Sequence, residues 1–158
     1  KTLTYKFILL LFSLLCYTLN SNAYNLRQIN NKDGLSNSSI LSVGQDENHL
    51  MLFGTCDGLN IFDGKDIQIF RSTPSNQAIK GNFIEKIITT QPGTYWIRTN
   101  SGLNKMNSQK GEFLFFPEFA GHNFIFTDCQ HDLFIYDGIG NLQIFNEKTK
   151  QFQSVLIQ

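Results

Sequence analysis

The chain contains an internal repeat, and this feature limits its possible folds more than any single motif does. Residues 52–60 align with residues 96–104 when the sequence is shifted by 44 positions, and Thr, Gly, Leu and Asn match at the same places. A further shift of 39 positions finds a weaker third copy, in which Leu103 aligns with Leu142. Within each copy, short runs of alternating apolar and polar residues predict strands. Periods of about 40–45 residues in a strand-rich chain are typical of β-propeller blades.

Four short strands are predicted in each copy, because Asn-, Asp- and Gly-rich turns separate the alternating runs. Gly58 and Gly102 are expected to take a positive φ, and Asn141 replaces them in the third copy. The predicted strands are Ile40–Gln45, Leu50–Thr55, Gly58–Asp63 and Asp66–Ser72; then Phe83–Thr90, Thr94–Thr99, Gly102–Asn107 and Phe113–Phe116; and finally Asn123–Asp128, Leu133–Tyr136, Asn141–Asn146 and Phe152–Ile157.

The fold class predicted from this pattern is all-β: a partial β-propeller over residues 24–158. Its three four-stranded blades are expected at approximately residues 36–72, 83–117 and 123–157, and residues 24–29 indicate an orphan closing strand. Known propellers close with about four to eight blades, so three blades form an incomplete part of a larger ring. Two blade faces would then be exposed, which predicts that the chain is the N-terminal part of a longer protein.

The first segment, residues 1–23, is predicted to be a signal peptide. Lys1 and Lys6 flank the start of an apolar run over residues 7–17, which is shorter than the roughly 20 residues that a membrane helix needs. Small residues precede the expected cleavage point after Ala23. The mature protein would be exported to a compartment that permits disulfides, where Cys56 and Cys129 are expected to remain buried free thiols.

Composition excludes two broad classes of protein. The 13 basic residues balance the 13 acidic ones, and no Lys/Arg cluster is present to neutralise nucleic-acid phosphates. Hydrophobic residues make up 41% of the chain and aromatic residues 13%, which excludes an intrinsically disordered segment. We therefore expect a folded module that does not bind nucleic acid.

A search for catalytic or metal-binding chemistry assigns no site. His49, His122 and His131 have no spacing typical of a zinc centre. Four aspartates precede glycines and are expected to form turns by accepting bonds from nearby backbone amides; these are Asp33, Asp57, Asp63 and Asp137. We predict no catalytic residue, metal ligand or cofactor, and leave the ligand-binding residues unassigned.

Aromatic side chains and one arginine are the remaining candidates for ligand contact. Tyr95, Trp96 and Tyr136 could stack on sugar rings, although packing between blades is the favoured interpretation. Arg98 places a charge within a predicted strand, where it could face a channel or a ligand. Extension of the Arg98 side chain into solvent is the preferred alternative.

Several segments together resemble the two-component regulator propeller repeat. They are residues 33–40, 45–46, 53–55, 57–60 and 62–64. The resemblance implies the periplasmic sensor region of a hybrid two-component histidine kinase, with an oligosaccharide as ligand and a tether to the inner membrane. The Trp-Ile-Gly-Thr segment of the family appears here in altered form at residues 52–55 and 96–99, and is lost from the third copy. The family's kinase domain is absent from these residues, so we expect no enzyme activity from this chain.

Two other functions remain open at this stage. A secreted binding module could complete its ring with a second copy of itself, because two copies would supply six blades. A propeller enzyme acting on polysaccharide is less favoured, since it needs two carboxylates at a separation that the sequence does not reveal. The partners expected are therefore an oligosaccharide, together with either the rest of the sensor polypeptide or another copy of the chain.

Overall fold

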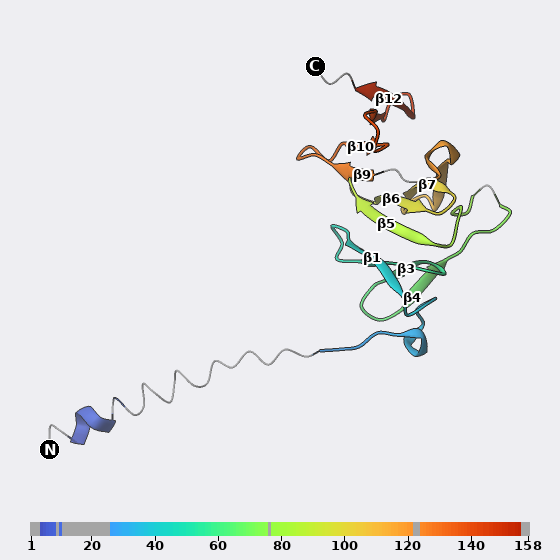
Figure 1. Cartoon of the computed structure of the whole chain (residues 1–158). Coiled ribbons are helices and arrows are strands. Elements are labelled where there is room, and N and C mark those ends of the chain that lie inside the picture. Colours follow the sequence, from blue (N-terminus) through green and yellow to red (C-terminus); the bar gives the residue numbers. More distant parts are fainter. Residues whose placement is uncertain (1–3, 9, 11–25, 76, 122–123, 156–158) are drawn as a thin grey trace.

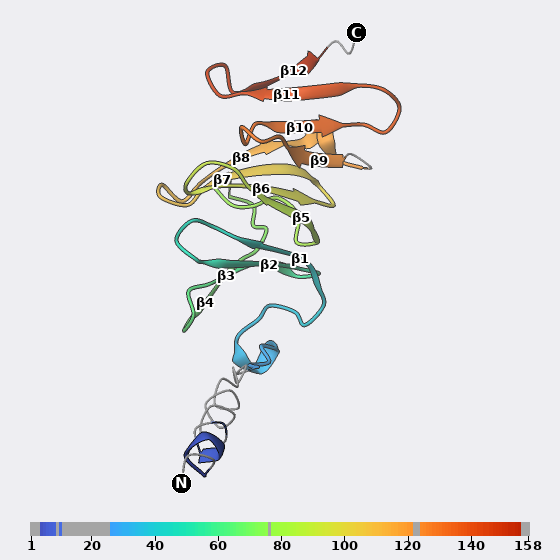
Figure 2. The same cartoon turned by 90° about the vertical axis from the view of Figure 1, so that its left-hand side faces the viewer.

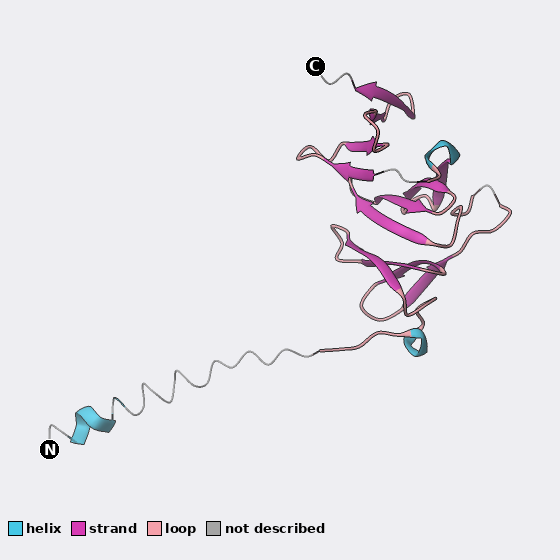
Figure 3. Cartoon of the chain, viewed as in Figure 1, coloured by secondary structure: helices cyan, strands magenta, loops and turns pink. Residues whose placement is uncertain are grey.

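The computed structural model describes residues 4–8, 10, 26–75, 77–121 and 124–155 (Figure 1). Within these residues, the strands form three four-stranded antiparallel sheets, each built from strands that are consecutive in sequence (Figure 3). Sheet 1 contains β1 (Ile40–Gln45), β2 (Met51–Thr55), β3 (Gly58–Phe62) and β4 (Ile67–Phe70). Sheet 2 contains β5 (Ile84–Thr89), β6 (Thr94–Thr99), β7 (Gly102–Asn107) and β8 (Glu112–Phe116). Sheet 3 contains β9 (Phe124–Thr127), β10 (Leu133–Tyr136), β11 (Leu142–Asn146) and β12 (Gln151–Val155).

The three sheets lie in layers in the order of the chain, with sheet 2 between the other two (Figure 2). The first strands of the sheets, β1, β5 and β9, follow one another through space. All twelve strands predicted for the three blades are present with small shifts at their ends, although the predicted positions 123, 156 and 157 lie outside the described residues. The prediction of an all-β, propeller-like fold is confirmed. The described residues form an open stack of sheets, without a closed ring.

Two apolar cores hold the stack together, one on each face of sheet 2. The first lies between sheets 1 and 2 and contains Leu52, Leu59, Ile79, Ile84, Ile87, Tyr95, Ile97 and Met106. The second lies between sheets 2 and 3 and contains Trp96, Leu103, Phe119, Ile125, Leu133, Ile135 and Phe145. Neighbours on a strand, such as Tyr95 and Trp96, belong to different cores because successive side chains point to opposite faces of a sheet.

The third strand of sheet 1 and the third strand of sheet 2 each contain a buried asparagine, which makes hydrogen bonds to the segment that precedes its sheet. Asn104 accepts a bond from the backbone N–H of Lys80 at 2.8 Å and donates to the carbonyl of the same residue at 3.0 Å. Asn60 accepts from the backbone N–H of Ser36 at 2.8 Å and donates to its Oγ at 2.8 Å. Ser36 and Lys80 are also 44 positions apart, so the repeat extends into the segments that precede sheets 1 and 2.

Backbone angles confirm one part of the turn prediction and correct another. Gly58 and Gly102 have φ values of 123° and 141°. A Cβ atom at Gly102 would lie 2.6 Å from the carbonyl oxygen of Phe116, so both conformation and close packing require glycine. Asn141 does not have a positive φ; in sheet 3 the neighbouring Gly140 takes this role with a φ of 125°.

The described part of the segment before sheet 1 pairs with none of the three sheets. Residues 26–29 belong to no strand, and the remaining two positions of the prediction, 24 and 25, lie outside the described residues. The Arg27 guanidinium instead lies 5.8 Å from the centre of the Phe62 ring. A 3-10 turn, η1 (Asn31–Asp33), follows. The role of residues 24–29 in closing a ring stays a prediction.

The predicted signal peptide is described only in part. Residues 4–8 and 10 are helical, whereas the expected cleavage point at Ala23 lies outside the described residues. None of the helices in the described part of the chain combines the length and apolar character needed to span a membrane.

Candidate functional site

Two of the three aromatic residues considered for sugar stacking are part of the apolar cores. Tyr95 and Trp96 are each 1% exposed, which confirms the preference for packing between sheets. Tyr136 is half-buried, and its ring stacks on Phe124 with 6.4 Å between ring centres. The structure therefore leaves Tyr95 and Trp96 no free ring face for a ligand.

The expectation that Arg98 reaches solvent is wrong. Its side chain is 17% exposed, and its Nη2 atom lies 2.7 Å from Oε2 of Glu85. The same nitrogen donates to the carbonyl oxygen of Gly121 at 2.9 Å, in the connection to sheet 3. The position 44 residues earlier is Gly54, where a Cβ atom would lie 2.7 Å from Cγ2 of Ile84. Arg98 thus occupies a position that, in sheet 1, only glycine can fill.

Three of the four candidate aspartates accept hydrogen bonds from nearby backbone amides, as predicted. Asp33 caps η1 by accepting from the backbone N–H of Asn30 at 2.9 Å. The Oδ1 atoms of Asp63 and Asp137 accept bonds from the amides that follow them, and these bonds lower the pKa of both carboxyl groups. Asp57 differs, because its carboxylate accepts bonds from the Arg71 guanidinium at 3.0 and 3.2 Å.

His49 and His131 lie in equivalent tight turns with φ values of 63° and 64°. Both precede the second strand of their sheets, while His122 lies outside the described residues. Across the described ranges, no group of three or more His, Cys, Asp or Glu side chains could hold a metal ion. Cys56 and Cys129 are free thiols, but the expectation that they are buried is wrong, since Cys56 is half-buried and Cys129 exposed.

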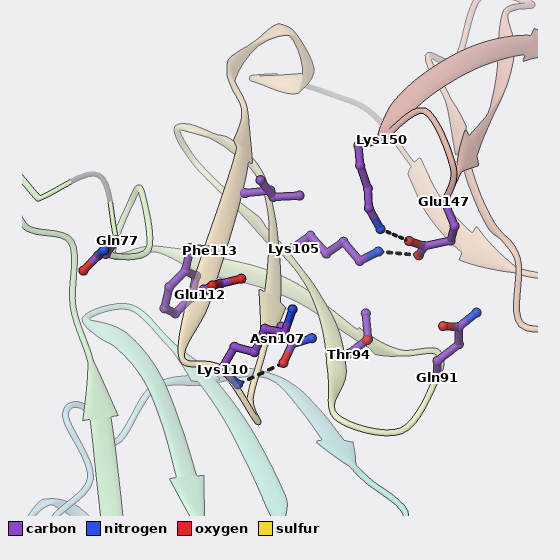
Figure 4. A pocket seen from close by; sticks show the side chains of 11 residues that line it. Gln77, Gln91, Thr94, Lys105, Asn107, Lys110, Glu112, Phe113, Glu147 and Lys150 are labelled. Carbon is purple, nitrogen blue, oxygen red and sulfur yellow. Dashed lines mark hydrogen bonds and ion pairs between the residues drawn. The ribbon is translucent and has the colours of Figure 1, made fainter.

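A cleft between sheets 2 and 3, which we call the inter-sheet cleft, combines a cavity with charged side chains (Figure 4). Its volume is about 600 Å³, within the usual range for small-molecule sites. Sheet 2 supplies one wall together with Gln77 from the connection between sheets 1 and 2, and the turn between β11 and β12 supplies the other wall. The lining residues are Gln77, Gln91, Thr94, Lys105, Asn107, Lys110, Glu112, Phe113, Leu114, Glu147 and Lys150.

Lys105 and Lys150 hold the two oxygens of a single carboxylate across this cleft. The Lys105 ammonium pairs with Oε1 of Glu147, and the Lys150 ammonium lies 2.7 Å from Oε2 (Figure 4). The Lys105 side chain is only 10% exposed, whereas that of Glu147 is 39% exposed. Lys105 also lies over two aromatic rings, 5.1 Å from the centre of Trp96 and 4.6 Å from that of Phe145.

Burial and pairing act in opposite directions on the charges of the inter-sheet cleft. Desolvation lowers the pKa of the Lys105 ammonium, although its bond to Glu147 opposes this effect. For Glu147, burial favours the neutral acid, but hydrogen bonds from Lys105 and Lys150 outweigh it and lower the pKa of the carboxyl group. The carboxylate is therefore the form that this pair of lysines selects.

The search for site residues in the sequence missed Lys105 and Glu147, although the repeat contains a signal for one of them. Lys105 aligns with Ile61 at the 44-residue shift, and Ile61 packs against the core between sheets 1 and 2. A charge has replaced an apolar residue at a position that faces the next sheet. Glu147 had no comparable signal, because its role depends on how sheet 3 lies over sheet 2.

Comparisons with known proteins agree on the class of protein. No protein-family model matches the chain. Over 72 residues, which are 44% of this chain and 5% of the relative, it is 38% identical to histidine kinase P4 of Formosa agariphila. The extracellular domain of a B. thetaiotaomicron protein assigned to hybrid two-component systems matches 83% of the chain at 26% identity, with a TM-score of 0.68. An auxiliary nutrient binding protein of Bacteroides ovatus matches 77% at 12% identity, with a TM-score of 0.52.

These matches confirm the resemblance to sensors of two-component systems. The structural neighbours are extracellular sensor or binding domains, and the fold that they share with this chain is all-β and propeller-like. The nutrient binding protein supports the fold alone, because its identity is low. The chain spans only 20% of the hybrid two-component protein's chain and 32% of the nutrient binding protein's.

Proposed function

We propose that this chain is the ligand-sensing propeller segment of a hybrid two-component sensor histidine kinase, that it responds to oligosaccharides, and that it catalyses no reaction. The observation that supports this most strongly is the match of 83% of the chain to an extracellular domain of a hybrid two-component system. The 72-residue likeness to a histidine kinase points in the same direction. Sensing requires a ligand site coupled to the rest of the protein, and the inter-sheet cleft lies between two sheets whose separation a ligand could alter.

The proposal includes export and a membrane tether. Residues 1–23 would act as the signal peptide and be removed after Ala23, which leaves residues 24–158 as the partial propeller in the periplasm. Residues 24–29 would pair with strands from a later part of the polypeptide. A membrane segment elsewhere in the sensor would then link ligand binding to the kinase.

An exposed apolar face on sheet 3 supports association with further protein. Phe124 is 62% exposed, and its ladder partner Tyr136 lies on the same face. Two rungs further along, and therefore on the same face, Phe126 and Phe134 stack with an angle of 10° between their rings. A monomeric protein rarely exposes a continuous apolar surface of this kind. We propose that the rest of the sensor polypeptide covers it; a second copy of the chain is the alternative.

The test is a deletion of the gene followed by growth on single oligosaccharides. Transcripts should lose their induction by one saccharide, and a plasmid copy of the gene should restore it. An unchanged transcript response to every saccharide would contradict the sensing role.

A blot with an antibody against residues 24–158 distinguishes the proposed sensor from a self-associating binding module. For the sensor, we expect a band in the membrane fraction several-fold above 18.1 kDa. A small periplasmic band would favour the self-associating binding module.

A further inference from the structure

The Glu147 side chain occupies a ready-made carboxylate site. Lys105 binds one oxygen and Lys150 the other, so the two ammonium groups converge on a planar anion from different elements, β7 and the β11–β12 turn. Charge-assisted hydrogen bonds of this kind are about twice as strong as neutral ones. The arrangement indicates that a carboxylate is the chemical group for which the inter-sheet cleft is suited.

The fold itself does not need a charge at position 105. In the first copy of the repeat the equivalent residue is Ile61, which packs against the core between sheets 1 and 2. Burial of an ammonium group opposes folding unless a partner compensates for it, whereas an apolar side chain would carry no such cost. The lysine therefore indicates a role in binding an anion.

The Glu147 carboxylate can leave the site without unfolding the turn that carries it. Asn146 holds the turn, because its Oδ1 atom accepts bonds from the amides of Lys148 and Thr149 at 2.9 and 3.2 Å. Its carbonyl also accepts from the N–H of Lys150 at 2.8 Å. Rotation of the half-exposed Glu147 side chain is then sufficient to expose Lys105 and Lys150 to a ligand.

The rest of the inter-sheet cleft is suited to a sugar. The side chains of Gln77, Gln91, Thr94 and Asn107 offer amide and hydroxyl groups, which both donate and accept hydrogen bonds as sugar hydroxyls require. Leu114 adds an exposed apolar surface on the same wall. With three lysines and two glutamates, the lining has a net charge of 3 − 2 = +1 before any ligand enters.

We infer that the inter-sheet cleft binds an acidic saccharide, whose carboxylate replaces that of Glu147 between Lys105 and Lys150. This inference rests on the proposed sensing function and names the chemical class of its ligand. Glu147 acts as an internal competitor that keeps the site closed in the absence of ligand. Because an attached group has an effective concentration in the millimolar range, a lone small anion competes poorly, and the saccharide needs its hydroxyl contacts to displace Glu147.

Calorimetric titration tests the inference on the protein expressed as its own gene encodes it. The probe is trigalacturonate at about 0.15 M salt, near physiological ionic strength, and the control ligand is the neutral galactose trimer. Trigalacturonate should bind, and Lys105→Met should weaken it roughly tenfold or more, as expected for loss of a hydrogen bond to a charged group. Glu147→Gln should tighten binding, because the competing carboxylate is gone. Lys148→Gln, a matched change on the same turn, should leave the affinity unchanged.

A second measurement covers the risk that Glu147→Gln destabilises the fold. This variant should melt at a lower temperature than the native protein, and trigalacturonate should restore the melting temperature while the neutral trimer does not. Equal binding of the acidic and neutral trimers would overturn the inference, as would an unchanged affinity in Lys105→Met. Displacement of the trimer by equimolar acetate or sulfate would also overturn it, since the cleft would then be a simple anion site.

The outcomes also separate this inference from the proposed function. If the deletion strain loses its response to a neutral saccharide and trigalacturonate does not bind, the sensing role stands and the acidic ligand is wrong. If trigalacturonate binds with the expected variant pattern but every transcript response is unchanged, the ligand class stands and the sensing role fails.

Discussion

Replacement of Asn104 by alanine tests the buried contact that joins the connection before sheet 2 to the sheet itself. The side chain is fully buried and makes two hydrogen bonds to the backbone of Lys80, at 2.8 and 3.0 Å. Alanine lacks both the oxygen that accepts from the Lys80 N–H and the nitrogen that donates to the Lys80 carbonyl. The N–H of Lys80 then lacks this acceptor, whereas its carbonyl still accepts from the Thr99 hydroxyl at 2.7 Å.

The expected loss follows from counting these contacts. Loss of one ordinary hydrogen bond lowers the free energy of unfolding by about 1 kcal/mol, and a buried donor left without a partner adds about 1–3 kcal/mol. Asn104→Ala should therefore lower the free energy of unfolding by about 2–4 kcal/mol. Asn104→Asp should lower it by at least as much, although aspartate has the same shape as asparagine, because its buried carboxylate would face the carbonyls of Lys80 and Ile97.

Urea unfolding of the protein as its gene encodes it, followed by circular dichroism, measures the difference. Asn48→Ala is the matched control, since this side chain is exposed and makes a weak 3.4 Å bond to its neighbour Glu47. Its loss should change the free energy of unfolding by less than about 0.5 kcal/mol. A loss below about 1 kcal/mol for Asn104→Ala, or native stability for Asn104→Asp, would refute the assigned role of the amide.

Three further predictions concern a glycine, a tyrosine and the cleft lysine. Gly102→Ala should lower the free energy of unfolding in urea by about 1–3 kcal/mol, because the backbone there is strained for alanine and the new Cβ atom clashes with Phe116. Gly111 has open space around it, so Gly111→Ala should lower the free energy of unfolding by less. Equal losses in the two variants would contradict this prediction. Burial and the 2.7 Å bond to Asp46 raise the pKa of Tyr95 to about 12, so the unfolded chain loses that proton first and stability should fall between pH 10 and 12. Tyr95→Phe should reduce this pH slope in parallel urea titrations, and an unchanged slope would refute the assignment. Lys105→Met should change the free energy of unfolding in urea by no more than about 1 kcal/mol, because an apolar residue suits this position. A larger loss would show that the ion pair stabilises the fold.

The strands were predictable because their signal is local and repeated. Alternation of apolar and polar residues, with glycine turns such as Gly58 and Gly102, predicts the strands of each sheet without knowledge of any other sheet. The same holds for the turn-forming role of Asp63 and Asp137. Asn141 was misassigned because the positive φ had moved to Gly140, a shift of one residue that the alignment of copies did not resolve.

The inter-sheet cleft was not predictable, although all its residues are in the sequence. Lys105 and Glu147 are 42 positions apart, and Arg98 and Gly121 are 23 apart. Nothing in the local pattern around either member of these pairs indicates the other. Each pair forms only because sheet 3 lies over one face of sheet 2, at a rotation that depends on packing across the second core.

The sequence by itself therefore determined the repeat, the strands, and the resemblance to a two-component sensor. These depend on residue spacing along the chain, which sets side-chain direction within a strand. The tertiary structure alone decided that Arg98 pairs with Glu85 and that two lysines converge on Glu147. The physical reason is that burial and charge pairing depend on distances between sheets, and those distances follow from how side chains of different copies fill the space between them.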